Sequence, residues 1–171
     1  MKRVYCLYLV VSCCCFAGYA QVTPLHQLTA TGAGIGTYSQ HFVDAFAAGI
    51  NQAALTQLSH FTFGIYAQRR FAVQAAGWYA AAAALPTQSG TWGASISHSG
   101  YKEVNQQLIG LAYAKSLGKY ISLGAQFDYV SLHIQQYGNA AALTFEGGVI
   151  GYVTKKLQAG IHVFNPLRQH Y

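Results

Sequence analysis

The chain has 171 residues, of which 53% are hydrophobic and only 8% are charged, and its formal net charge at pH 7 is +6. Soluble domains usually carry charge on about a quarter of their residues, so this composition argues against an ordinary soluble domain. The positive balance does not indicate a nucleic-acid partner, because the basic residues form neither a stripe nor a basic–aromatic motif.

Residues 1–20 predict a secretory signal peptide. Two basic residues precede an apolar run from Val4 to Phe16, and small residues lead to a cleavage site after Ala20. An N-terminal membrane anchor is an alternative, although the run is shorter than the roughly 17–25 residues of a spanning helix. A lipoprotein signal is a second alternative, because residues 10–13 loosely match a lipid-attachment box.

All four cysteines lie inside this predicted signal, at Cys6, Cys13, Cys14 and Cys15. The exported chain would therefore have no disulfide and no cysteine metal site. An exported domain of this size without disulfides has to be stabilised by core burial or by a membrane.

The chain after Leu58 consists of segments in which apolar residues alternate with small or polar ones, which is the pattern of strands with two unlike faces. Several segments exceed the five or six residues of an average strand and match the roughly 9–11 residues of a tilted membrane strand. The predicted strands are His60–Gln68, Phe71–Leu85, Thr91–Ser99, Val104–Lys115, Lys119–Gln135, Asn139–Thr154 and Leu157–Asn165.

The connections between these strands alternate in character along the chain. Those at 86–90, 116–118 and 154–156 are tight, whereas those at 67–71, 98–105 and 136–139 are more polar or longer. Short turns at one rim and longer loops at the other are typical of outer-membrane barrels. We therefore predict an antiparallel up-and-down sheet with the two sets of connections at opposite rims.

The two faces predict what surrounds such a sheet. We expect Leu111, Phe127, Phe145 and Ile161 to point outward to lipid, and Gln126, Thr144 and His162 to point inward. The polar face carries few of the Lys and Glu residues that a water-exposed surface needs, which favours a barrel interior. A soluble secreted or periplasmic lipocalin-like barrel is the alternative.

In the stretch from Lys119 to Gly138 the apolar residues occupy odd positions up to Tyr129 and even positions from Val130 onward. A two-residue hairpin loop at Tyr137-Gly138 and a β-bulge near Tyr129 account for the change, and a strand that ends at Tyr129 is the alternative. The bulged register places Asp128 directly opposite Glu146 on the inner face. We interpret this acidic pair either as a spot that biases what enters the barrel or as a solvated pair in a wet lumen, and in neither case as catalytic.

Residues 21–58 differ from the rest, because they combine Gly-rich coil with a short helix expected around Asn51–Leu58. Asp44-Ala45-Phe46, followed by the box from Asn51 to Leu55, resembles the start of FadL/PorV-type outer-membrane barrels. Those proteins carry an aspartate and then an Asn-Pro-Ala-Gly-Leu-like box before their first long strand. The matching positions are Asp44, Asn51, Ala53 and Leu55, while Gln52 and Ala54 stand where the family has proline and glycine.

This resemblance covers residues 31–58 by motif and the remainder by strand rhythm. It implies a barrel of about fourteen strands with an N-terminal segment that plugs or lines the lumen. It also implies a role in moving hydrophobic molecules or in protein secretion. Because single-chain bacterial barrels have an even number of strands, the seven strands predicted here suggest an N-terminal half, a truncated member, or a fragment that pairs with something else.

Residue patterns for chemistry are sparse. The seven histidines show no metal-site spacing, and there is no nucleophile elbow. We therefore expect no enzyme activity, no cofactor and no metal. The aromatic residues predicted to lie at the membrane interface or to fill the barrel are Tyr66, Trp78, Tyr79, Trp92, Tyr101 and Tyr113.

Together these features predict an all-β protein, an antiparallel up-and-down transmembrane β-barrel or partial barrel with a Gly-rich, partly helical plug. The expected parts are a signal peptide at 1–20, a plug or lumen segment at 21–58 and barrel strands at 59–171. The expected location is the outer membrane after export. The expected partners are outer-membrane lipid and either hydrophobic small molecules or secretion-system proteins.

Overall fold

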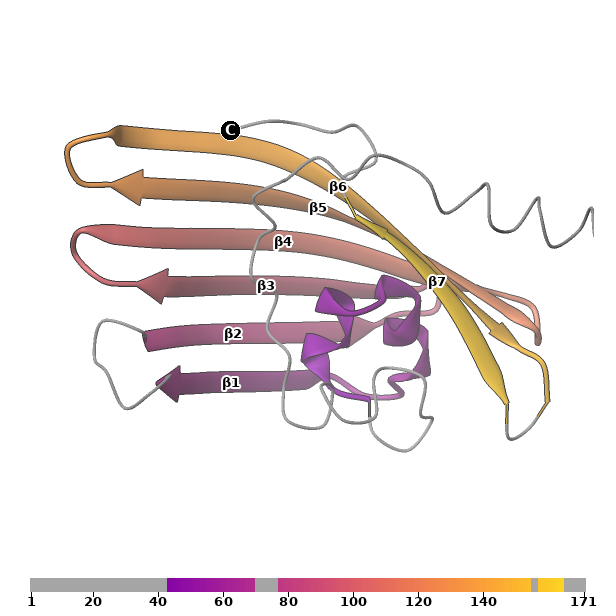
Figure 1. Cartoon of the computed structure of the whole chain (residues 1–171). Helices are drawn as coiled ribbons and strands as arrows, with labels where there is room; N and C mark the ends of the chain where they lie inside the picture. The colour runs from indigo at the N-terminus through magenta and orange to yellow at the C-terminus, as the bar shows by residue number, and fades with distance from the viewer. Residues whose placement is uncertain (1–42, 70–76, 155–156, 165–171) are drawn as a thin grey trace, which may run out of the picture.

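The computed structural model describes residues 43–69, 77–154 and 157–164, and the strands in these ranges form one antiparallel sheet. Each strand pairs with the next one in sequence, which gives the up-and-down order β1 to β7 (Figure 1). The all-β fold class and the antiparallel up-and-down order of seven strands are confirmed, while the first six residues of the predicted strand Phe71–Leu85 lie outside the described residues. The strands are β1 Thr62–Arg69, β2 Gly77–Pro86, β3 Thr91–Gly100, β4 Val104–Leu117, β5 Ile121–Ile134, β6 Gly138–Tyr152 and β7 Gln158–Phe164.

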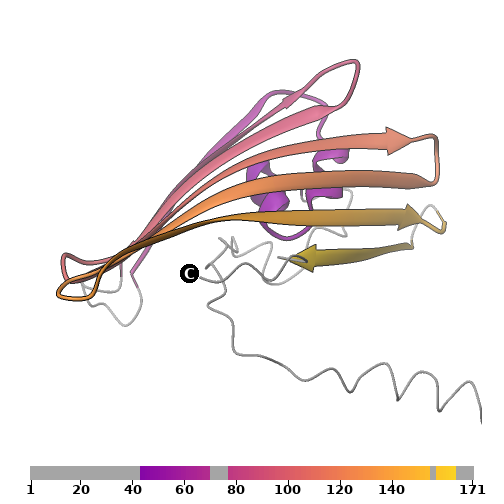
Figure 2. The same ribbon diagram turned by 90° about the horizontal axis from the view of Figure 1, so that it is seen from above.

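The sheet is open and strongly curved. Strands β1 and β7 form its two ends and do not pair with each other, so the described residues do not form a closed barrel. Two short 3₁₀ helices, η1 (Ala45–Gly49) and η2 (Gln52–Gln57), lie on the concave side of the curve (Figure 2).

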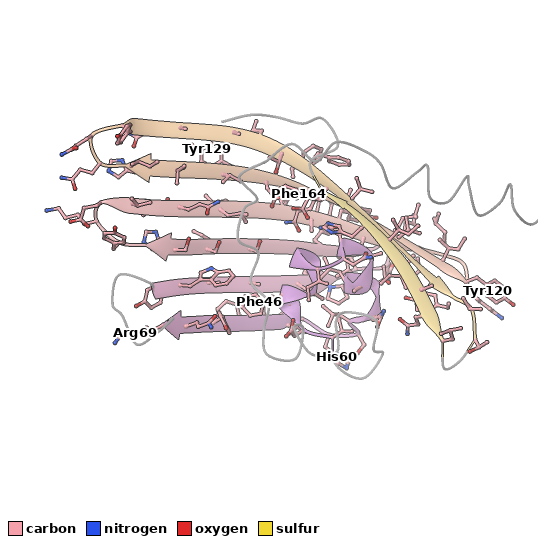
Figure 3. All side chains as sticks on the ribbon, in the orientation of Figure 1. Phe46, His60, Arg69, Tyr120, Tyr129 and Phe164 are labelled. Atoms are coloured by element: carbon pink, nitrogen blue, oxygen red, sulfur yellow. The ribbon has the colours of Figure 1, made fainter. Side chains whose placement is uncertain are left out.

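The two rims hold the connections that the sequence assigns to them. The β2–β3 and β4–β5 connections lie at one rim and the β3–β4 and β5–β6 connections at the opposite rim, as Figure 1 shows. Arg69 and Tyr120 mark these opposite rims in Figure 3. The predicted connections at 67–71 and 154–156 extend into residues 70–76 and 155–156, which lie outside the described ranges.

The predicted division into two faces is also confirmed. Phe127 is 64% exposed and Ile161 is 70% exposed on the convex face, whereas Gln126 is 1% exposed on the concave face. Leu111 and Phe145 share the convex face with Phe127, since all three occupy the same level of neighbouring strands. Thr144 and His162 lie on the concave side.

The predicted β-bulge near Tyr129 is wrong. Strands β5 and β6 pair without interruption from Ile121–Gly151 to Ile134–Gly138. The connection is a three-residue loop, Gln135–Tyr137, in which Gln136 has a φ of 74°. An odd loop length preserves the alternation of faces, so no extra residue has to be absorbed.

The change of phase in the sequence has a different cause. Val130 and Leu132 lie on the same concave face as Asp128, because the alternation continues through Tyr129. The inward side chains change from polar at Gln126 and Asp128 to apolar at Val130 and Leu132, while their face stays the same. Val130 is fully buried and is paired in register with the buried Leu108 of β4.

The β4–β5 turn agrees better with the expectation. Its three residues are Gly118–Tyr120, and Gly118 has a φ of 76°, the left-handed conformation that a three-residue hairpin loop requires at one position. Strand β4 extends to Leu117, two residues beyond the predicted end at Lys115.

A pair of engineered cysteines tests the observed β5–β6 register. Ser131 and Ala141 are directly opposite, and the Cα spacing of opposed residues, about 4.5–5.5 Å, suits a disulfide. We expect Ser131→Cys with Ala141→Cys to cross-link under mild oxidation, as seen by altered gel mobility. The bulged register instead opposes Ser131 to Thr144, so efficient cross-linking of Ser131→Cys with Thr144→Cys would contradict the structure.

Candidate functional site

Two residues of the family-like motif act as helix caps. The Asp44 Oδ1 atom accepts a hydrogen bond of 2.9 Å from the Phe46 backbone N–H and caps η1. The Asn51 Oδ1 atom accepts a 3.1 Å hydrogen bond from the Ala53 backbone N–H and caps η2. Short Asp and Asn side chains suit this position because they reach the free N–H groups of a first turn. Helix η2 was predicted from the sequence, whereas η1 was not.

The two helices are buried against the concave face of the sheet. Helix η1 packs on β1 to β3 and η2 on β3 to β6. Ala53 and Leu55, the other two motif residues, are fully buried. Phe46, the one aromatic residue of η1, is part of the core and packs edge to face on Tyr66 of β1, with ring centroids 6.4 Å apart.

Strand glycines make this close packing possible. A Cβ atom at Gly64 would lie 2.7 Å from the Phe46 ring, and one at Gly93 would lie 2.8 Å from Leu55 Cδ1. At Gly124 it would meet the Ala53 backbone nitrogen at 2.5 Å, and at Gly148 it would collide with the Asn51 side chain. Side chains at these positions would displace the helices. We call the four positions the glycine seat: Gly64, Gly93, Gly124 and Gly148.

A buried polar cluster anchors η2 to the far end of the sheet. The Gln52 Nε2 atom donates hydrogen bonds to Glu146 Oε2, at 2.6 Å, and to the Ala48 carbonyl oxygen, at 2.9 Å. His162 Nε2 of β7 lies 3.0 Å from the same Glu146 oxygen. Asn51 Nδ2 adds donor contacts to the Val149 and Ile161 carbonyl oxygens, at 3.4 and 3.3 Å. We call Gln52, Glu146 and His162 the anchor cluster.

The predicted acidic pair is only partly present. Asp128 and Glu146 do share the concave face, but Asp128 is opposite Thr144 and Glu146 is opposite Gln126. The prediction that the two acids face each other directly is therefore wrong, because the connecting loop has three residues instead of two. Both carboxylates are fully buried, so the interpretation as a solvated pair is wrong too.

Gln126 is the residue that lies beside both acids. Its Nε2 atom donates a 2.6 Å hydrogen bond to Asp128 Oδ1, and it is the register partner of Glu146 on the next strand. The concave face thus separates the two carboxylates with an amide and uses Glu146 to hold η2. In this arrangement both carboxylates are withdrawn from the surface of the concave face.

A second polar cluster, which the sequence did not indicate, lies near the β4–β5 rim. The Ser122 hydroxyl is within 2.9 Å of the Thr56 hydroxyl, 3.1 Å of Ser116 and 3.2 Å of Tyr152. Thr56, Ser116 and Tyr152 line a surface cavity of about 680 Å³ that Lys119 also lines, and Ser122 is buried behind them. Four single hydroxyl residues on separate elements give no recognisable sequence pattern, which is why sequence reasoning missed them.

The described ranges contain no group of three His, Cys, Asp or Glu side chains placed to hold a metal ion. None of the helices in the described part of the chain has the length and apolar character needed to cross a membrane. The buried polar groups on the concave face hold the segment of η1 and η2 against the strands.

Comparison of the chain with protein-family models, with curated proteins and with solved structures finds no match.

Loss of the Glu146 carboxylate should destabilise the protein. Glu146→Ala removes one of the two acceptors of the buried Gln52 amide and leaves only the Ala48 carbonyl oxygen, and an unsatisfied buried polar group costs about 1–3 kcal/mol. We expect a loss of this size in the free energy of unfolding, measured by urea titration. Glu103→Ala removes an exposed carboxylate and should change stability by less than about 0.5 kcal/mol. Equal effects of the two variants would contradict the anchoring role.

The glycine seat can be tested with two glycines on adjacent strands. Gly124→Val drives a side chain into the Ala53 backbone, whereas a Cβ at Gly147, on the convex face, meets nothing within 4 Å. We expect Gly124→Val to lower the free energy of unfolding by about 1–3 kcal/mol or more and Gly147→Val to leave it nearly unchanged. A Gly124→Val protein as stable as the wild type would show that η2 does not depend on the seat.

Proposed function

We propose that this chain contributes a wall of strands to an outer-membrane β-barrel of the FadL/PorV type, which takes part in transport of hydrophobic molecules or in protein secretion. The observation that carries the proposal is a continuous apolar belt on the convex face. The exposed side chains of this belt are Phe63, Ile65, Leu85, Trp92, Ile96, Ile109, Leu111, Leu123, Phe127, Leu143, Val149, Ile161 and Val163.

The height of the belt supports contact with a bilayer. On β5 it extends from Ile121 to Tyr129, about nine residues or roughly 30 Å of strand. A strand tilt of roughly 40° reduces this to about 23 Å, close to the roughly 25 Å apolar band of outer-membrane barrels. Among the described strands, Arg69 and Lys115 are the only outward-pointing residues of the Asp, Glu, Lys and Arg types.

The belt has a polar border on one side. Beyond Tyr129 and Leu143 the convex face changes to polar side chains at matching levels of neighbouring strands, namely His98, Gln107, Ser131, His133 and Asn139. Aromatic residues occur toward the other border, where Trp92 and Tyr113 pack with ring centroids 4.7 Å apart. Aromatic rings with a polar group are typical of membrane–water interfaces.

The filled concave face also favours a membrane protein over the soluble alternative. A soluble ligand-binding barrel buries its apolar side chains inside and keeps an internal cavity for the ligand. Here η1 and η2 occupy the inside and the large apolar side chains point outward. An exposed apolar surface of this extent in water would associate or aggregate.

The tightly held helices bear on the choice between the two roles. The anchor cluster and the glycine seat fix η2 through buried contacts, so passage of a molecule along this face would require those contacts to break. A filled barrel that offers its rims to secretion-system proteins needs no such change. The packing therefore favours the secretion role over transport.

The proposal requires additional strands at both edges of the sheet. Strands β1 and β7 each have one neighbour, and free backbone N–H and C=O groups are too costly within a bilayer. Strands from elsewhere in the same protein or from a partner would satisfy them and close the barrel.

An arginine placed in the belt tests this function. Phe127→Arg puts a charge at the level of lipid tails, which costs about 2–4 kcal/mol near the bilayer midplane. Ser131→Arg lies on the same strand and face but beyond the polar border, where the cost falls to about 0–1 kcal/mol. We expect Phe127→Arg, and not Ser131→Arg, to reduce the folded, protease-resistant protein in the outer-membrane fraction. Soluble and fully folded Phe127→Arg protein would instead support the soluble binding barrel.

A further inference from the structure

A groove crosses the convex face over β4 to β7. Its floor is formed by Ala125 and Gly147, which are paired in register, and the Gly147 position is open to the outside. One wall is Phe145, whose ring packs on that of Phe127 with centroids 5.3 Å apart. The other wall is the pair Leu123 and Val149, one level closer to the rim. The space measures about 580 Å³, within the range of roughly 300–1,000 Å³ typical of small-molecule sites.

A single cation lies at one end of this apolar groove. Lys115 lines the groove and is the register partner of Leu123. The Leu117–Ile121 pair lies between Lys115 and the turn. The backbone of Lys115 is therefore within the apolar belt, and its side chain has to extend toward the rim to place the ammonium group in a polar environment. Long lysine side chains do this readily at membrane surfaces.

No acid of this chain can neutralise Lys115 from the same face. The four acidic residues of the sequence are Asp44, Glu103, Asp128 and Glu146. Asp44 caps η1 on the concave side, Asp128 and Glu146 are buried there, and Glu103 belongs to the opposite rim. An anion paired with Lys115 on this face would therefore not be one of the Asp or Glu side chains of the chain.

We propose that this groove binds one anionic phospholipid, with an acyl chain lying over Ala125 and Gly147 and the headgroup phosphate paired with Lys115. The proposal rests on the function proposed above, because it requires the convex face to be in contact with lipid. A second apolar depression on the same face, of about 390 Å³ and lined by Ala81, Ala94 and Ile109, has no Lys or Arg in its lining. It provides an internal comparison for the role of the charge.

Trp92 offers a direct readout of lipid bound at this place. It is 47% exposed on the convex face and packs on Tyr113, which lines the groove, while the other tryptophan, Trp78, is 5% exposed on the concave face. The full-length protein is reconstituted in phosphatidylcholine vesicles that contain increasing amounts of dibrominated phosphatidylglycerol or dibrominated phosphatidylcholine. Bromine quenches only a tryptophan that it approaches closely, so Trp78 supplies a constant background.

We expect half-maximal quenching at about fivefold less brominated phosphatidylglycerol than brominated phosphatidylcholine, the effect of one basic residue near an anionic headgroup. Lys115→Gln should abolish this preference, and Lys119→Gln, which removes the same charge from the adjacent turn, should keep it. Gly147→Leu fills the groove and should also abolish the preference, whereas Ala81→Leu in the other depression should not.

The possible results separate this proposal from the function on which it rests. Equal quenching by both lipids, unchanged in Lys115→Gln, would overturn the lipid site and leave the membrane location standing. Absence of quenching by either lipid would overturn the membrane location itself. A preference that depends on Lys119 and not on Lys115 would assign the anion to the turn. A change of oligomeric state in Gly147→Leu without a change in quenching would show that a second copy covers the groove. Either a preference that depends on Lys119 or such a change of oligomeric state would overturn the proposal.

Discussion

The buried hydrogen bond between Gln52 and Glu146, 2.6 Å long, is the interaction on which the arrangement of the inside depends. It ties η2 to β6, and the glycine seat allows the helix backbone to approach the strands closely enough to make it. The helices cover the concave face at one end of the strands (Figure 1), and Glu146 is buried there. The large apolar side chains of the convex face remain exposed, and removing such a surface from water is favourable.

The strands and their faces could be predicted from the sequence because side-chain alternation determines both. The β5–β6 loop could not, since Gln136 adopts a positive φ that is uncommon for a residue other than glycine, asparagine or aspartate. The Tyr137-Gly138 pair looked like the turn, and this difference of one residue in loop length produced both the incorrect bulge and the incorrect pairing of Asp128 with Glu146. The number of residues in this loop, odd or even, thus decides which side chains of β5 and β6 are predicted to face each other.

The candidate site was predictable only where its residues are close in sequence. Asp44 and Asn51 precede short helices and cap them locally, so a local motif identified them. Gln52 and Glu146 are 94 positions apart, and Gln52 and His162 are 110 apart. Their contact depends on the curvature of the sheet and on the space left by glycines far from η2 in sequence, such as Gly124 and Gly148. A single sequence contains no local signal for either.

The central claim is that the convex face of the strands is in contact with lipid. Nitroxide labels on single cysteines from Leu123 to His133, in the full-length protein reconstituted in vesicles, test it through collision rates with oxygen and with a water-soluble nickel complex. The structure predicts high oxygen and low nickel accessibility at Phe127, the reverse at Ser131, and low accessibility to both at the buried Gln126. Nickel accessibility at Phe127 as high as at Ser131 would contradict the claim.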